Sequence, residues 1–189
     1  YRENILNKCA AVFCVSQFIK SKFLKDIKEN FEKVHVLHNG VERKLTRFPK
    51  KKKEVLFVGR LVPEKGVHFY VEAVKAIAHK HPKWSFDLIG SFKLGDNKNR
   101  NFYSDTIIKK IRSIGPQAKF YGFQNQKFVE KRMKSASIVI IPSVWEEPFG
   151  LVAAEAMSSG ACIIATKVGG IPEIIKDNGI LLDNINHIK

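Results

Sequence analysis

The stretch SIVIIPSVWEEPFGLVAAEAMSSGACIIAT, residues 137–166, combines two apolar runs with a helical pattern between them. SIVIIPS at 137–143 and ACIIAT at 161–166 are continuous apolar segments, which is typical of strands buried on both faces of a sheet. Residues 149–151 are expected to open the helix that lies between the two strands. A strand, a helix and a second strand in this order predict a right-handed βαβ unit with parallel strands.

The same alternation continues on both sides of this unit. Further buried strands are predicted at 54–59, 84–90, 118–122 and 179–182. Further helices are predicted at about 66–79, 103–113, 125–134 and 169–175. The polar stretch 91–101 carries Gly, Asp and Asn residues and is expected to be a loop. We therefore predict an α/β fold, with a Rossmann-like parallel sheet and helices on both faces.

The beginning of the chain follows a different pattern. Residues 2–8 resemble the end of a helix, and the apolar run at 10–16 predicts a buried strand. Ser16 is expected to cap a helix that reaches about Lys28. A short strand and an Asn39-Gly40 turn should follow before the regular alternation begins.

The chain of 189 residues carries a formal charge of +15, with a pI near 9.8. Such an excess favours an anionic partner: nucleic acid, an anionic membrane surface or a phosphate-bearing ligand. One cluster, at 42–54, holds two acidic residues and seven basic ones, which are Arg43, Lys44, Arg47 and Lys50 to Lys53. A block of like charges repels itself, so we expect a solvated linker there, with a membrane-facing role as the alternative.

No run of about 18 apolar residues occurs, so no membrane-spanning helix is predicted, and the start does not resemble a signal peptide. The three cysteines, Cys9, Cys14 and Cys162, lack metal-ligand spacing, and their odd number argues against a disulfide framework. We expect them to be buried thiols in a reducing cytoplasm.

Ligands of open parallel sheets bind at the carboxyl ends of the strands. The loops at those ends follow Val58, Ile89, Tyr121 and Ile141. The first of them, GRLVPEKG at 59–66, places Arg60 and Lys65 before a helix whose free N–H groups attract anions. This combination favours a phosphate or diphosphate site, although the spacing matches neither a P-loop nor G-x-G-x-x-G. A simple solvated loop is the alternative.

Two carboxylates flank the predicted helix start at 149–151. Glu147 precedes it, and Glu155 lies further along the helix among small apolar residues. A buried carboxylate is costly unless something satisfies it. Because the first amides of a helix are unpaired, we expect both carboxylates to face one ligand beside them, with Glu155 accepting a vicinal diol. The alternative is an ion pair between Glu155 and a cation of the first loop, with Glu147 at the surface.

These residues carry a resemblance to a known family. EPFGLVAAEAM at 147–157 looks like the Glu-x7-Glu signature of retaining GT-B glycosyltransferases, the group 1 family (glycosyltransferase family 4) that uses nucleotide sugars. VGRLVPEKG at 58–66 resembles the diphosphate loop of that family, and ATKVGGIPEII at 165–175 resembles its GG-x-x-E segment. VFCVSQFIKSKF at 12–23 and VHVLHNGVE at 34–42 resemble the segments that close the first domain and cross to the second.

The resemblance implies two Rossmann-like domains that face each other across a cleft. Residues 1–45 would be the end of the acceptor-side domain with the crossover, and residues 46–189 the nucleotide-sugar-binding domain without its last helices. A fragment of this kind is not expected to complete a transfer alone.

The resemblance also implies roles for single residues. Arg60 and Lys65 would bind the donor diphosphate, Glu147 would hold the sugar and Glu155 the ribose. The implied catalytic residues are Glu147, Arg60 and Lys65. The implied donor-binding residues are Gly59, Arg60, Lys65, Gly90, Tyr121, Gly122, Phe123, Glu147, Phe149, Gly150, Leu151, Val152 and Glu155. No metal and no other cofactor is expected.

The implied reaction moves a sugar from a UDP- or GDP-sugar to an acceptor hydroxyl with retention of anomeric configuration. The implied products are lipopolysaccharide, glycolipid or another cell-surface glycan. We expect a cytoplasmic enzyme, peripheral at the inner face of the membrane, with a sugar or lipid-linked acceptor. Two alternatives stay open. One is a basic nucleic-acid-binding module, which rests on charge alone because no nucleic-acid-binding motif occurs. The other is a nucleotide-sugar-binding domain without activity.

Overall fold

The computed structural model describes residues 2–27, 29–42, 47–93 and 101–183. Most of them form one Rossmann-like domain around a parallel sheet with the strand order β5-β4-β3-β6-β7-β8. The strands of this sheet are β3 (Lys52–Val58), β4 (Ser85–Ile89), β5 (Ala118–Gly122), β6 (Ala136–Ile141), β7 (Cys162–Thr166) and β8 (Ile180–Leu182). The predicted α/β fold is confirmed.

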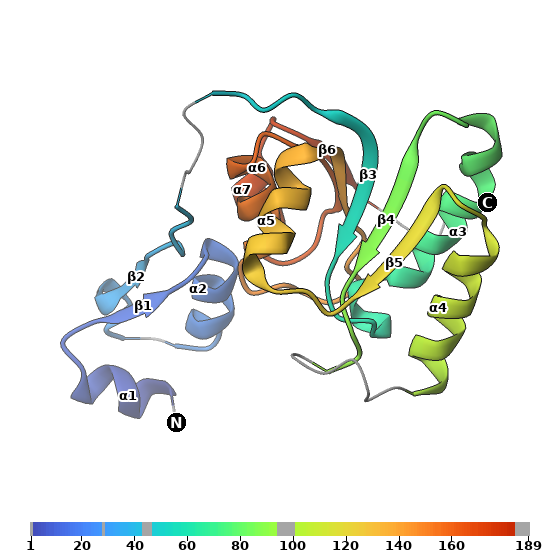
Figure 1. The fold of residues 1–189 in the computed structure, drawn as a ribbon. Helices are drawn as coiled ribbons and strands as arrows, with labels where there is room; N and C mark the ends of the chain where they lie inside the picture. Colours follow the sequence, from blue (N-terminus) through green and yellow to red (C-terminus); the bar gives the residue numbers. More distant parts are fainter. Residues whose placement is uncertain (1, 28, 43–46, 94–100, 184–189) are drawn as a thin grey trace.

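Helices cover both faces of this sheet (Figure 1). They are α3 (Val67–Ile77), α4 (Phe102–Ser113), α5 (Gln126–Ser135), α6 (Leu151–Ser158) and α7 (Ile171–Ile175), with short 3-10 turns at Pro63–Lys65 and Ala78–Lys80. The helices α3 and α4 pack on one face around the buried side chains of Tyr70 and Ile111. The helices α5, α6 and α7 pack on the other face around Met133 and Ala156. Each face therefore has its own apolar core.

Polar residues fix the starts of two of these helices. At α4, the side chain of Asn101 accepts from the Ser104 N–H at 2.8 Å, and Ser104 Oγ accepts from the Asn101 N–H at 2.9 Å. At α5, Asn125 Oδ1 accepts from the Phe128 N–H at 2.9 Å. These contacts satisfy first-turn N–H groups that have no partner within the helix.

The strand order reverses between β3 and β6, which lie side by side in the sheet. The chain leaves β3 towards α3 on one face and leaves β6 towards α6 on the other. Two loops that diverge in this way leave a crevice at the carboxyl ends of their strands. In Figure 1 the arrows of β3, β4 and β5 all point to the lower edge, so these loops gather there.

The N-terminal segment contains α1 (Arg2–Lys8), β1 (Val12–Cys14), α2 (Gln17–Leu24), a 3-10 turn (Phe31–Lys33) and β2 (Val34–Val36). β1 and β2 pair in parallel, and α2 is the element that lies towards the larger domain (Figure 1). Ser16 caps α2 as predicted, because its Oγ accepts from the Ile19 N–H at 3.0 Å. The helix ends at Leu24, before the predicted Lys28, since the C-cap Lys25 has a non-helical ψ of 123° and Asp26 follows with a positive φ of 69°.

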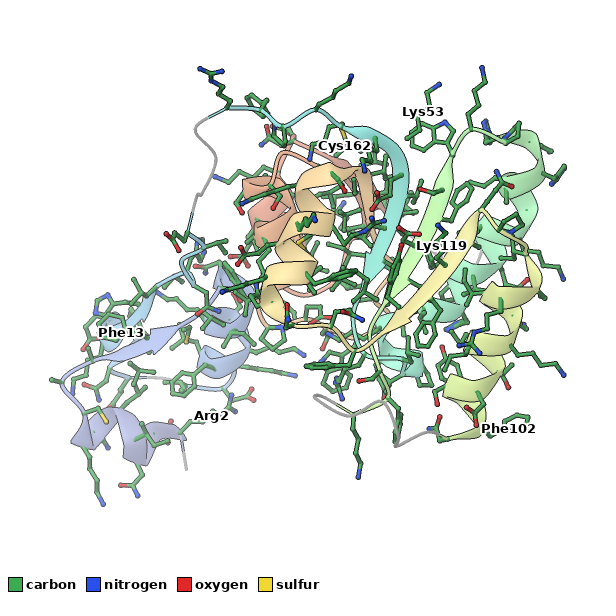
Figure 2. All side chains as sticks on the ribbon, in the orientation of Figure 1. Arg2, Phe13, Lys53, Phe102, Lys119 and Cys162 are labelled. Carbon is green, nitrogen blue, oxygen red and sulfur yellow. The ribbon has the colours of Figure 1, made fainter. Side chains whose placement is uncertain are left out.

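The basic cluster falls partly on residues 43–46, which lie outside the described residues. Lys50, Lys52 and Lys53 are exposed, and Figure 2 shows Lys53 at the edge of the sheet opposite to the carboxyl ends. Lys51 differs, because its Nζ donates to the carbonyls of Met133 at 3.3 Å and Ser159 at 2.8 Å. Burial lowers the Lys51 pKa from its ordinary value. The expectation of a solvated linker is therefore wrong for Lys51, which fastens the start of β3 to α5 and α6, and for residues 52–54, which belong to β3.

The cysteine prediction is partly wrong. Cys14 is buried, and burial raises the pKa of its thiol. Cys9 and Cys162 are exposed, and Cys162 stands at the start of β7 (Figure 2). Of the helices within the described ranges, none has the length and apolar character needed to cross a membrane. The polar loop predicted at 91–101 lies mostly outside the described residues.

Candidate functional site

A cavity of about 460 Å³ opens at the carboxyl ends of β3 and β6. Its position is the point of reversed strand order, where ligands of open parallel sheets bind. Four parts of the larger domain form its walls: the end of β3 with the loop after it, the end of β6 with the loop after it, the first turn of α6, and Ile171 at the start of α7. Val15 and Asn39 of the N-terminal segment complete the wall. The predicted site residues that line it are Gly59, Lys65, Glu147, Phe149, Gly150, Leu151 and Val152.

Lys65 and Glu147 form an ion pair inside this cavity, with side chains 26% and 13% exposed. The same Glu147 oxygen accepts from Ser143 Oγ at 2.8 Å. The alternative of a Glu147 at the surface is therefore wrong. Each charged group is partly removed from water, and the opposite charge of its partner compensates for the lost hydration. Removing one partner would leave the other charge uncompensated in the cavity.

Backbone contacts hold the two loops that carry this pair. The Glu64 carbonyl accepts from the N–H groups of Val144 at 3.0 Å and Trp145 at 3.2 Å. Next to it, Gly66 has a positive φ of 64°, and a Cβ at this position would lie 1.7 Å from the Pro142 carbonyl oxygen. Only glycine permits both the conformation and the close approach. The loop after β3 is thus pressed against the loop after β6, which brings Lys65 to Glu147.

The N-terminus of α6 forms a second polar feature of the cavity. Gly150 is the N-cap and has a φ of 102°, and the first helical bond runs from the Ala153 N–H to the Gly150 carbonyl at 2.9 Å. The N–H groups of Gly150, Leu151 and Val152 have no acceptor within the described part of the chain. Unpaired amides at the positive end of a helix attract anions. The cavity therefore offers an ammonium group, a carboxylate and a set of amide donors side by side.

A smaller pocket of about 170 Å³ lies beside the cavity, at the carboxyl ends of β3 and β4. It is lined by Gly59, Arg60, Gly90 and Phe123, all of which belong to the predicted donor-binding set. Arg60 is exposed and lines this pocket rather than the cavity of Lys65. The two predicted cations are thus separated, with Gly59 shared between their two hollows.

The predicted site residues at the end of β5 and in the loop after it have different environments. The ring of Tyr121 packs against Phe128 with centroids 5.4 Å apart, and the Arg132 guanidinium lies 5.2 Å from its centroid. Arg132 in turn forms ion pairs with the buried carboxylates of Glu54 and Asp87. Tyr121 therefore packs towards α5, whereas Phe123 and Gln124, in the loop after β5, line the smaller pocket.

Glu155 lines a third hollow, of about 250 Å³, between α5, α6 and residues 40–42. Its Oε1 accepts from Gln126 Nε2 at 3.4 Å, and burial raises the pKa of its carboxyl above the ordinary value. Leu151 lines both this hollow and the cavity of Glu147. The expectation that Glu147 and Glu155 face a single cavity is wrong in this structure. Glu155 lies one turn into α6, and its side chain points towards α5.

Ten residues that line the cavity are absent from the predicted set: Val15, Asn39, Phe57, Val58, Ile141, Pro142, Ser143, Pro148, Ala153 and Ile171. Asn39 was assigned only to a turn, and Ser143 only to a loop. Ser143 had a usable signal, since it ends a buried strand four positions before Glu147. Val15 had none, because its place depends on how the N-terminal segment packs. Within the described ranges, no three His, Cys, Asp or Glu side chains are grouped so as to hold a metal ion.

Relatives in sequence include glycosyltransferases and a spore coat protein. An uncharacterized glycosyltransferase of Methanocaldococcus jannaschii is 32% identical over 187 residues, covering 89% of this chain and 46% of the relative. Spore coat protein SA of Bacillus subtilis is 33% identical over 144 residues, which cover 73% of this chain and 37% of the relative. The lipopolysaccharide 1,2-N-acetylglucosaminetransferase of Salmonella typhimurium is 28% identical over 65% of this chain and 32% of its own.

A solved structure similar to this one is that of HepE from Anabaena in complex with UDP-glucose. It has a TM-score of 0.74 and 25% identity, over 95% of this chain and 51% of HepE. The chain spans about half the length of the first relatives and structures that it matches. These structural neighbours have the GT-B fold, and the Rossmann-like sheet agrees with it. The model of the family Glycosyl transferases group 1 matches residues 39–187, so the chain belongs to that family.

Proposed function

We propose that this chain carries the donor-binding half of a retaining glycosyltransferase that takes its sugar from a nucleoside diphosphate sugar. The observation that carries the proposal is the partly buried ion pair of Lys65 and Glu147 beside the unpaired amides of α6. Three groups in the cavity match the three parts of such a donor. The ammonium group matches the diphosphate, the carboxylate matches the hydroxylated sugar, and the amides match the phosphate nearest to the sugar. Membership of the family favours a transferase over a nucleic-acid-binding module or an inactive binding domain.

Each part of the donor has a matching place. The diphosphate lies between Lys65 and the first amides of α6, and the sugar hydroxyls bind Glu147. The base occupies the smaller pocket of Gly90 and Phe123, where Arg60 closes the side towards the diphosphate. Glu155 accepts the ribose hydroxyls after a turn of its side chain away from Gln126. The UDP-glucose complex of the Anabaena relative supports a uridine nucleotide as the first donor to test.

The proposed reaction needs no further cofactor. The bond between the anomeric carbon and the diphosphate oxygen breaks, and the acceptor oxygen forms its new bond from the same face. The acceptor proton passes to the departing diphosphate, so atoms and charges balance. Lys65 and the α6 amides stabilise the negative charge that develops on the leaving group, which is the main electrostatic contribution of the protein. Retention is supported by the Glu-x7-Glu pattern of residues 147–155.

The test is calorimetry of the chain with UDP, GDP and UDP-glucose in buffer with EDTA. Binding of a nucleoside diphosphate without a divalent ion is the expected result. A chain that binds none of the three, or that binds only after Mg²⁺ is added, would contradict the site assignment. A nucleic-acid-binding module would instead bind oligonucleotides with an affinity that falls steeply with salt.

We further propose that the enzyme works at the cytoplasmic face of a membrane, on a lipid-linked or lipopolysaccharide-type acceptor. Exposed Lys50, Lys52 and Lys53 follow Phe48 within five positions in the sequence, and the side chain of Phe48 is 80% exposed. A lysine near an anionic surface contributes about 1 kcal/mol, and an exposed aromatic ring can enter the interface. The name of the Salmonella relative supports an acceptor of this class.

Sedimentation with anionic and neutral vesicles tests this attachment. The triple variant of Lys50, Lys52 and Lys53 to Gln should lose binding to anionic vesicles, and Lys51 is left intact because it holds the fold together. A matched control removes the same charge at exposed lysines elsewhere, which are Lys109, Lys119 and Lys127. Equal binding by both triple variants would contradict a specific membrane-facing cluster.

A further inference from the structure

The carboxylate of Glu173, on α7, caps a helix of the N-terminal segment. Its Oε2 accepts from the Gln17 N–H and its Oε1 from the Phe18 N–H, each at 2.7 Å. Both donors belong to the first turn of α2, where N–H groups have no partner within the helix. The side chain of Glu173 is 24% exposed, and His38 Nε2 lies 3.5 Å from its Oε2. One side chain thus satisfies two amides that lie more than 150 positions away in the chain.

The same end of α2 touches the loop of the proposed donor site. Ser16 Oγ donates to the Pro148 carbonyl at 2.6 Å, and the hydroxyl is completely buried. The ring of His38 packs on Phe149 with centroids 5.7 Å apart. Lys22, one turn further along α2, forms an ion pair with Glu146. The N-terminal segment therefore contacts residues 146, 148 and 149, through α2 with its N-cap and through His38.

A contact at the start of α7 connects it to Glu147, one member of the ion pair in the cavity. The Gly170 N–H donates to the Glu147 carbonyl at 2.8 Å, and Gly170 is the residue before α7. The backbone of Glu147 is thus tied to α7 directly, and Pro148 is tied to α7 through α2 and Glu173. A closed ring of contacts results, in which Glu173 supplies two of the hydrogen bonds that join the N-terminal segment to the larger domain.

We propose that Glu173 is a positioning residue, which fixes α2 on the larger domain and thereby sets the position of the loop at 146–149 and of the cavity walls Val15 and Asn39. A carboxylate suits this place because each of its two oxygens receives one amide, and its charge faces the positive end of α2. The contact itself needs no assumption about activity. Its effect on nucleotide binding rests on the proposed function.

Hydrogen exchange at single amides tests the contact. Glu173→Gln keeps the size of the side chain but has one acceptor oxygen and no charge, so exchange at Gln17 and Phe18 should accelerate at least about tenfold. Exchange at Gly170 should accelerate with it, whereas the central strands β6 and β7 should keep their protection. Glu72→Gln is the matched control, because Glu72 pairs with Lys110 between α3 and α4, away from this contact.

Affinity for UDP, measured by calorimetry on the same variants, tests the consequence for the site. Coupling through packed contacts predicts that Glu173→Gln weakens UDP binding by between about twofold and thirtyfold, and that Glu72→Gln leaves it unchanged. Unchanged exchange at Gln17 and Phe18 would overturn the contact. Faster exchange there, with Gly170 and UDP affinity unaltered, would overturn the positioning role. A wild-type chain that binds no UDP would contradict the proposed donor site alone, since the exchange at Gly170 still decides the inference.

Discussion

Replacing Lys65 by Gln should separate the stability of the chain from its affinity for a nucleotide. The substitution removes the cation of the cavity and leaves Glu147 with Ser143 as its remaining side-chain partner within the described residues. Two unit charges about 4 Å apart attract by about 4 kcal/mol at an effective dielectric constant of about 20, and desolvation of both groups offsets part of this. Because the pair is partly exposed, we expect a loss of about 1–2 kcal/mol in the free energy of unfolding.

The double variant with Lys65→Gln and Glu147→Gln decides what this loss means. Removing both charges leaves no uncompensated carboxylate, so most of the stability should return. In both variants the affinity for UDP should be lower than that of the wild type by about tenfold or more, since a charge-assisted contact to the diphosphate contributes about 1.5–3 kcal/mol. Urea denaturation gives the stabilities, and calorimetry gives the affinities.

The ion pair of Glu72 and Lys110 is the control for this experiment, because both side chains are about half exposed and lie away from the cavity. An exposed pair contributes about 0–1 kcal/mol, so Lys110→Gln should change stability little and UDP affinity not at all. The reasoning fails if the double variant recovers nucleotide binding together with stability, or if Lys65→Gln binds UDP as tightly as the wild type.

Three further substitutions test other parts of the structure. Burial raises the Glu155 pKa, so its ionised form opposes folding, and stability should fall as pH rises through the raised pKa. Glu155→Gln should remove that fall, which begins near the ordinary Glu pKa of about 4.3, in urea denaturation, while weakening UDP binding in calorimetry. Gly66→Ala should cost several kcal/mol through its contact and positive φ, whereas Gly40→Ala, with open space around it, should not lower the melting temperature. Lys51→Met should lower the free energy of unfolding by about 1–2 kcal/mol, and Lys53→Met should leave it unchanged.

The sequence predicted the elements of the fold well because each strand of the sheet is a short apolar run between polar loops. The run AKFYG at 118–122 coincides with β5, and the strand predicted at 84–90 differs from β4 by one residue at each end. Errors occurred where a local conformation that the pattern does not record ended an element. The end of α2 at Leu24 depends on the backbone conformations of Lys25 and Asp26, which no periodicity indicates.

The candidate site was predicted in part, for a similar reason. The rule that ligands bind at the carboxyl ends of parallel strands predicted Lys65 and the start of α6 as parts of the site, and both line the main cavity. The direction of a side chain on a helix was not available from the sequence. Glu155 was expected beside Glu147, but its rotation about the helix axis turns it towards Gln126 on α5. The contacts of Glu173 join residues more than 150 positions apart, and a single sequence contains no pattern for them.

The two loops of the cavity are joined through main-chain atoms, since the carbonyl of Glu64 receives the amides of Val144 and Trp145. Every amino acid except proline supplies those same atoms, so the side chains at these three positions can be exchanged without loss of the joint. The main-chain contacts that join the two loops are therefore independent of the side chains at these three positions. Libraries at 64, 144 and 145, where all three side chains are exposed, should therefore still give mostly folded protein with the two loops joined.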